Sequence, residues 1–211
     1  MGCENSKIIS GNKQLKNPTD SEQQLKKSDM QCSLEDEIVE LTPKQKELLT
    51  ETWKQLVENI SNVGVITFMN LFETHPDVQD VFMPFKGLSV EELRHSKELR
   101  AHGLRVMGFV QKVVARLDEP EKSEQLLKEL GRNHVMYGAK VDYVDLIGPQ
   151  FVFAVKPSME KYWSEEIEDA WIQLFRYMAY QMKKAMLERT CPKSPSNEEV
   201  TKESDIKLNE S

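Results

Sequence analysis

Two histidines of this 211-residue chain occupy the apolar faces of expected helices. His102 has Leu99 three residues before it and Val106 four residues after it, and His134 follows Leu130 by one helical turn. Taken singly, each histidine is typical of a side chain that finds a hydrogen bond inside a protein core. Taken together, two imidazoles from different helices can approach a metal from opposite sides. The pair is therefore the strongest chemical signal in the sequence.

Haem is the metal group that suits two such imidazoles. Two histidines alone make a poor site for a bare metal ion, because closed zinc sites take four ligands. Haem iron needs only axial imidazoles from the protein, together with an apolar slot for the macrocycle. A carbonyl of the turn before His134 can accept the second ring proton, which fixes the tautomer and strengthens a metal bond. The chain has no C-x-x-C-H motif, so we expect haem b without a covalent link.

Composition excludes several other classes of protein. The net charge of −7, with no run of Lys and Arg interleaved with aromatic residues, argues against nucleic acid as a partner. Cys3, Cys32 and Cys191 form no C-x-x-C pair, which favours a reducing compartment and no disulfide framework. Apolar runs fall far short of the roughly 20 residues that span a bilayer, and the polar start lacks a secretory signal. No hydrolase or kinase motif is present.

The chain divides into one domain between two polar tails. Residues 1–40 and 190–211 are rich in polar and charged residues, which predicts flexible tails. In residues 41–189, apolar residues recur at steps of three and four, and no alternating segment indicates a strand. We expect an all-α domain of about eight helices.

Local signals predict where the helices begin and end. Thr42 with Gln45 and Ser89 with Glu92 match capping boxes, and proline is expected to begin or end helices elsewhere. The expected elements are helices from Pro43 to about Ile60 and from about Ser61 to His75, a short helix from Pro76, an irregular corner at 81–88, the His102 helix to about Leu117, the His134 helix to 137–138, and two long helices at about 143–162 and 165–188.

Several ordered features between about Leu41 and Glu188 resemble the globin family. They are Trp53, Gly64 eleven residues before His75-Pro76, Phe82 and Phe85, "HGLRV" at 102–106, and "LGRNH" at 130–134. The resemblance implies a globin fold around a haem pocket. It assigns His134 as proximal iron ligand, His102 as distal histidine, Phe82 as the aromatic against the haem, Phe68 and Val106 as distal walls, and Phe85 and Leu130 as further pocket residues.

Three of these positions have a second reading. Phe82 and Phe85 can fill core space as well as contact haem, and the two roles are compatible. Arg105 is expected at the pocket edge, where a haem propionate would pair with its guanidinium, or else as a solvated surface residue.

Gly64 and Gly103 lack side chains where two crossing helices must approach closely, so that the distal helix can be held near the cofactor.

The first residues, "MGCENS", fit a pattern for lipid attachment. Gly2 with Ser6 matches N-myristoylation, and Cys3 is a candidate for palmitoylation. One myristoyl chain binds a membrane only marginally, and residues 1–40 carry more acidic residues than lysines, so Cys3 would supply the second signal. We expect an anchor at the cytoplasmic face of the cell membrane. The alternative is a plain polar tail on a soluble cytoplasmic protein.

A globin domain behind a Gly-Cys start is similar to globin X, the membrane-associated branch of the family. The resemblance implies that His102 binds the iron when no gas does, and that oxygen, nitric oxide and carbon monoxide bind reversibly. It also implies redox chemistry, either reduction of nitrite or oxidation of nitric oxide, with His102 as proton donor and a reductase as a further candidate partner. Two alternatives are a five-coordinate globin for oxygen transport or storage, and a haemless helical adaptor at a membrane.

Overall fold

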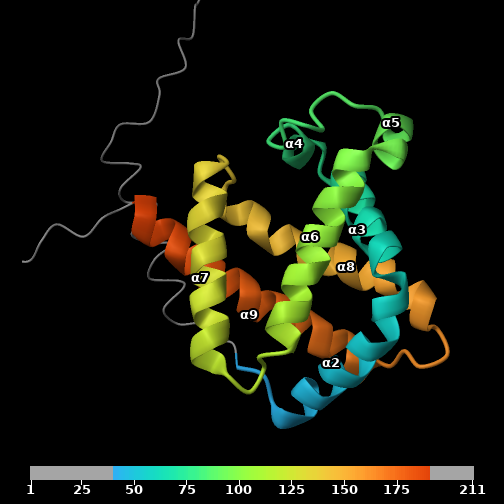
Figure 1. Ribbon diagram of the computed structural model, residues 1–211, viewed down its shortest axis with the longest axis vertical. Coiled ribbons are helices and arrows are strands. Elements are labelled where there is room, and N and C mark those ends of the chain that lie inside the picture. Colours follow the sequence, from blue (N-terminus) through green and yellow to red (C-terminus); the bar gives the residue numbers. More distant parts are fainter. Residues whose placement is uncertain (1–39, 191–211) are drawn as a thin grey trace, which may run out of the picture.

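The computed structural model describes residues 40–190, and this part of the chain is helical without a strand (Figure 1). The all-α prediction is thereby confirmed. The expected tails lie almost wholly outside the described residues, as do Gly2 and Cys3. The α-helices are α2 (Pro43–Leu56), α3 (Ile60–Thr74), α4 (Pro76–Gln79), α5 (Val90–His95), α6 (Lys97–Val114), α7 (Pro120–Met136), α8 (Ile147–Val155) and α9 (Glu165–Thr190); the 3-10 helices are η1 (Val57–Asn59), η2 (Val141–Leu146) and η3 (Lys156–Met159).

Both predicted capping boxes form and begin helices at the predicted residues. The Gln45 amide donates to the Thr42 hydroxyl at 3.2 Å, while the Thr42 amide donates to the Gln45 side chain at 2.9 Å. The Glu92 amide donates to Ser89 Oγ at 3.3 Å, and the Ser89 amide donates to Glu92 Oε2 at 2.8 Å. These contacts satisfy amides that have no partner inside the helix, so local sequence is enough to place the start of α2 and α5.

The helix that carries His102 is separated from α5 by a single residue. Ser96 has extended backbone (φ −66°, ψ 124°), and its hydroxyl accepts a hydrogen bond from the Leu99 amide at 3.1 Å. This N-cap starts α6 at Lys97 in a new direction. The helix ends at Val114, slightly before the predicted Leu117. His102 thus lies in the second turn of a helix with a defined start.

The prediction of one continuous helix from about 143 to 162 was wrong. The structure divides this stretch into η2, α8 and η3. Pro149 lies in the first turn of α8 and Pro157 in the first turn of η3, where the missing amide hydrogen does no harm. An uninterrupted helix would have placed both prolines in its interior, at a cost of about 3 kcal/mol each. The final helix, α9, was predicted correctly within two residues.

Two clusters of buried side chains form the core. The larger cluster centres on Trp171, whose ring lies 4.9 Å from that of Phe151 and 6.0 Å from that of Trp53. The smaller cluster contains Phe68, Phe72, Phe85, Leu93 and Leu99. Val106 and Ile147 are partly buried and pack against both clusters. The two clusters therefore meet beside α6, one turn from His102.

Helix packing holds the two histidine-bearing helices independently of each other. α6 packs on α3, whereas α7 packs on α9, and Figure 1 draws α6 and α7 as separate columns. At the α7 crossing, a Cβ on Gly131 would meet the carbonyl oxygen of Met182. Only glycine lets the α7 backbone approach α9 this closely. None of the helices in residues 40–190 is long and apolar enough to cross a membrane.

Candidate functional site

His102 lies in an aromatic surround on α6. Its ring is 4.6 Å from the ring of Phe68, 5.4 Å from Phe82 and 6.2 Å from Phe85, centroid to centroid, and all three pairs meet edge to face. Phe68 comes from α3, while Phe82 and Phe85 come from the corner between α4 and α5. The resemblance to globins assigned these three phenylalanines to the haem pocket, and the structure brings all of them to His102. Their role toward haem stays a prediction.

The His102 imidazole is held neutral. Burial, with smaller contributions from the nearby Arg105 and His134, lowers its pKa from 6.5 to about 4. Among the described residues, the structure gives this ring no hydrogen-bond partner. A neutral imidazole keeps a lone pair that can bind a metal, whereas a protonated one has none. At pH 7 the ring is therefore ready to act as a ligand without first losing a proton.

His134 lies in the last turn of α7 with its ring orientation fixed. Its Nδ1 atom is 2.8 Å from the carbonyl oxygen of Leu130, one turn earlier. Because a carbonyl only accepts hydrogen bonds, Nδ1 must carry the proton, which leaves the Nε2 lone pair free. Metal-binding histidines are characteristically held by such a contact. The contact was predicted from the spacing of the two residues, and the structure confirms it.

The two histidines come from different helices, α6 and α7, and are close enough to interact electrostatically. His134 is one of the charges that lower the pKa of His102. The Leu130 side chain packs against the larger core cluster, and Val106 lies beside His102 between both clusters. The described residues contain no group of three His, Cys, Asp or Glu that would hold a bare metal ion. Two imidazoles in an apolar surround suit a planar group that brings its own nitrogen ligands.

Arg105 is exposed on α6 and has no ion pair within residues 40–190. Its charge nevertheless reaches His102 and lowers that residue's pKa. Arg105 follows His102 by three residues on the same helix, so its guanidinium remains available to an anionic group near the histidine. This placement fits both readings of Arg105 that the sequence left open.

Comparison with known proteins decides the family. A family model described as Globin matches residues 66–182, which is more than half of the chain. The chain belongs to the globin family. A neuroglobin from Tetraodon nigroviridis is 27% identical to this globin over 143 residues, which cover 67% of this chain and 90% of the relative. Cytoglobin-1 from Oryzias latipes is 27% identical over 146 residues, or 68% of this chain and 82% of the relative.

A solved structure has the same fold as this globin. It is described as a hexacoordinated haem protein from an anhydrobiotic tardigrade at pH 4. The TM-score is 0.66 at 23% sequence identity, and the match covers 70% of this chain and 96% of that one. The predicted globin fold is thus confirmed. The finer resemblance to globin X stays a prediction.

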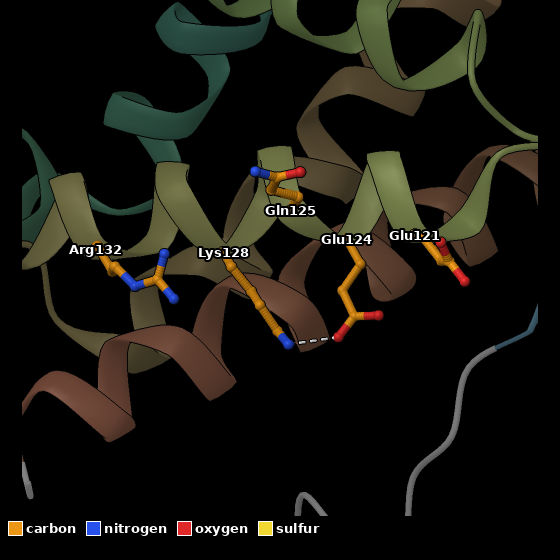
Figure 2. Close-up of a pocket in the computed structure, with 5 residues that line it drawn as sticks. All are labelled: Glu121, Glu124, Gln125, Lys128 and Arg132. Carbon is orange, nitrogen blue, oxygen red and sulfur yellow. Dashed lines mark ion pairs between the residues drawn. The ribbon is translucent and has the colours of Figure 1, made fainter.

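A surface depression of this globin lies away from the histidines. It has a volume of about 300 Å³, and α7 alone lines it with Glu121, Glu124, Gln125, Lys128 and Arg132 (Figure 2). Lys128 Nζ pairs with Glu124 Oε1 at 2.5 Å. Charged residues of both signs along one helix face are typical of a solvated surface. None of the predicted site residues lines this depression.

Gln79 is a residue that supports the site of this globin and that the sequence did not reveal. Its side-chain Nε2 donates to the carbonyl oxygen of Phe85 at 2.7 Å and to that of Leu88 at 2.9 Å. These bonds close the corner that presents Phe82 and Phe85 to His102. A glutamine at the end of a short helix carries no pattern that points to this role, because both acceptors are backbone atoms.

Proposed function

We propose that this globin holds haem b between His102 and His134, with both imidazoles on the iron when no gas is bound, and that it binds oxygen and other diatomic gases reversibly. One observation carries the proposal: a partly buried imidazole on α6, without a hydrogen bond among residues 40–190, lies close to a second imidazole on α7 whose Nδ1 proton is donated to the Leu130 carbonyl. When bound, the haem iron supplies the coordination positions and a one-electron redox couple.

The residues present fit this cofactor on both sides. On the distal side, Phe68, Phe82 and Val106 give an apolar surface around His102. On the proximal side, the Leu130 carbonyl orients His134 and increases its basicity as a ligand. Arg105 offers a positive charge for a propionate at the edge of the site.

His102 acts in this proposal as a gate. A gas molecule must wait for the imidazole to move away, so the apparent affinity falls by the fraction of protein in which the site is open. The edge-to-face contact with Phe68 at 4.6 Å opposes this movement. Since the ring is neutral at pH 7, its departure and return do not require a proton to be exchanged.

The optical spectrum of the purified ferrous full-length protein, before and after addition of carbon monoxide, tests the proposal. We expect a low-spin spectrum that carbon monoxide changes, a high-spin spectrum for His102→Leu, and loss of haem for His134→Ala. His95→Ala is the matched control, because His95 is exposed and, in the part of the chain that the structure describes, pairs with Glu91 at 2.9 Å. A high-spin wild type would favour a five-coordinate oxygen carrier. A colourless protein would favour the haemless adaptor.

The redox part of the proposal concerns nitrite and nitric oxide. In its buried position His102 is unprotonated near neutral pH, so it can donate a proton only after it has moved to a more solvated position, where its pKa approaches 6.5. We expect nitrite consumption by the reduced protein under anaerobic conditions to accelerate as the pH falls. The same pH dependence in His102→Leu would show that the imidazole is not the proton source.

Membrane attachment is the last part of the proposal, and its support is the sequence "MGCENS". Dual acylation of Gly2 and Cys3 would anchor the globin to the cytoplasmic face of the cell membrane. In cells, Gly2→Ala is expected to move the protein to the soluble fraction, and Cys3→Ser to weaken its retention. Unchanged partitioning of Gly2→Ala would contradict the lipid anchor.

A further inference from the structure

Three side chains connect the segment that follows His134 to the helix that precedes the distal corner. The Tyr143 hydroxyl donates to Asp77 Oδ2 at 2.7 Å, although the two residues are 66 positions apart. Lys140 Nζ donates to the same hydroxyl at 2.9 Å and lies 4.9 Å from the centre of the Tyr143 ring. Lys140, Tyr143 and Asp77 are called the clasp below.

One end of the clasp is continuous with the last turn of α7. Gly138 turns the chain with a φ of +76°, which favours glycine. The Ala139 amide then donates to the His134 carbonyl oxygen at 3.1 Å, and the Tyr143 amide donates to that of Lys140 at 3.2 Å. The backbone from His134 to Tyr143 is therefore held by its own hydrogen bonds, so a displacement of Tyr143 is passed toward His134.

The other end of the clasp belongs to the distal side. Asp77 lies in α4, between Pro76 and the buried Val78, which packs in the cluster that contains Phe68 and Phe85. Gln79, which follows Val78, holds the corner at 81–88 by donating hydrogen bonds to two of its carbonyl oxygens. The ring of Tyr143 also packs against this cluster. The clasp thus joins the backbone that carries His134 to the aromatic residues that surround His102.

Charge strengthens both hydrogen bonds of the clasp. The Tyr143 hydroxyl is the main cause of a lowered pKa of Asp77, with His75 and Lys140 contributing in the same direction. The same hydroxyl is the main cause of a raised pKa of Lys140. Asp77 is therefore ionised and Lys140 protonated near neutral pH, and hydrogen bonds to charged groups are the stronger kind.

We propose that the clasp limits how far the His134 side and the His102 side of the site separate, and that it thereby slows the loss of haem. The second half of this inference rests on the proposed function. The first half does not, because it concerns contacts within the chain alone. Tyr143 and Asp77 are positioning residues in this inference, since they act through the two sides and not by contact with the iron.

Tyr143→Phe tests the inference, because it removes the hydroxyl and keeps the ring in the aromatic cluster. In the full-length protein, we expect faster hydrogen exchange of backbone amides in 138–146, with and without added haemin. We also expect haem transfer to an excess of a haem-free acceptor globin to accelerate about tenfold, the size of effect expected for one charge-assisted hydrogen bond. Tyr162→Phe is the matched control, since Tyr162 is an exposed tyrosine outside the clasp.

Asp77→Asn tests the same inference by a second variant, at an exposed position. We expect it to accelerate exchange and haem transfer, and the double variant Asp77→Asn/Tyr143→Phe to be no faster than the stronger single variant. Unchanged exchange in both single variants, or a double variant with multiplied effects, would overturn the inference. A wild type that takes up no haem would instead contradict the proposed function. The exchange measurements would still show whether the clasp restrains the two sides of the site.

Discussion

Gly64 of α3 and Gly103 of α6 lie back to back where the two helices cross. A Cβ on Gly64 would lie 2.9 Å from the carbonyl carbon of Gly103, and a Cβ on Gly103 would lie 3.0 Å from that of Gly64. The sequence predicted a close crossing at these glycines, and the structure confirms it. Because His102 precedes Gly103 and Phe68 follows Gly64 by about one turn, the crossing also fixes the contact between their rings.

Gly103→Ala is expected to destabilise the fold by about 1–3 kcal/mol, because the added carbon meets backbone atoms that cannot rotate away. Gly108→Ala is the matched control on the same helix, since its Cβ would meet nothing within 4 Å. That variant is expected to be neutral or more stable by up to about 1 kcal/mol. Denaturant unfolding of both full-length variants measures the difference. Equal stabilities would contradict the close crossing.

Thr52→Val is expected to cost about 1–3 kcal/mol of unfolding free energy. The Nε1 atom of the fully buried Trp171 donates to Thr52 Oγ1 at 3.1 Å, and valine would leave this donor without a partner. Thr67→Val is the control: Thr67 is also buried, and among residues 40–190 its hydroxyl donates to the Val63 carbonyl of its own helix at 2.7 Å and accepts from no other side chain. Calorimetric unfolding should show a much smaller loss for Thr67→Val. A loss of the same size would mean that the Trp171 contact contributes nothing specific.

The stability of the haem-free chain is expected to fall as the pH drops from about 6.5 to about 4, in part because of His102. The unfolded chain protonates this histidine near pH 6.5, whereas the folded chain does so only near pH 4. Between these values the unfolded state binds up to about one more proton, so acid favours unfolding; below pH 4 the contribution is constant. Unfolding free energies of the wild type and of His102→Gln at several pH values isolate the contribution of His102 to this pH dependence. Parallel pH curves for the two proteins would refute the prediction.

Gln79→Leu is expected to loosen the corner at 81–88, because the carbonyl oxygens of Phe85 and Leu88 lose their shared donor. We expect a loss of about 1–3 kcal/mol in stability and faster hydrogen exchange of backbone amides in the corner. Gln125→Leu is a suitable control, since Gln125 is exposed on the outer face of α7 (Figure 2). Unchanged exchange in 81–88 would show that the aromatic packing holds the corner without Gln79.

The order of the helices and the orientation of His134 could be predicted because they depend on contacts between residues close in sequence. A capping box joins residues three positions apart, and the hydrogen bond from His134 to Leu130 joins residues four apart in one helix. Such contacts form whenever the helix forms. The prediction of one helix at about 143–162 was wrong because the apolar period continues through Pro149 and Pro157, so it did not reveal the division into η2, α8 and η3.

By itself, the sequence predicted the all-α class, the starts of α2, α5 and α9, and the close crossing at Gly64 and Gly103. It also singled out His102 and His134 as candidate metal ligands. Only the tertiary structure decided that His102 is neutral, because its pKa depends on burial and on the charge of His134 from another helix. The tertiary structure also decided that Tyr143 bonds to Asp77 and that Gln79 bonds to the corner. Local patterns reflect hydrogen bonds within one turn, whereas these contacts exist only once distant helices have packed.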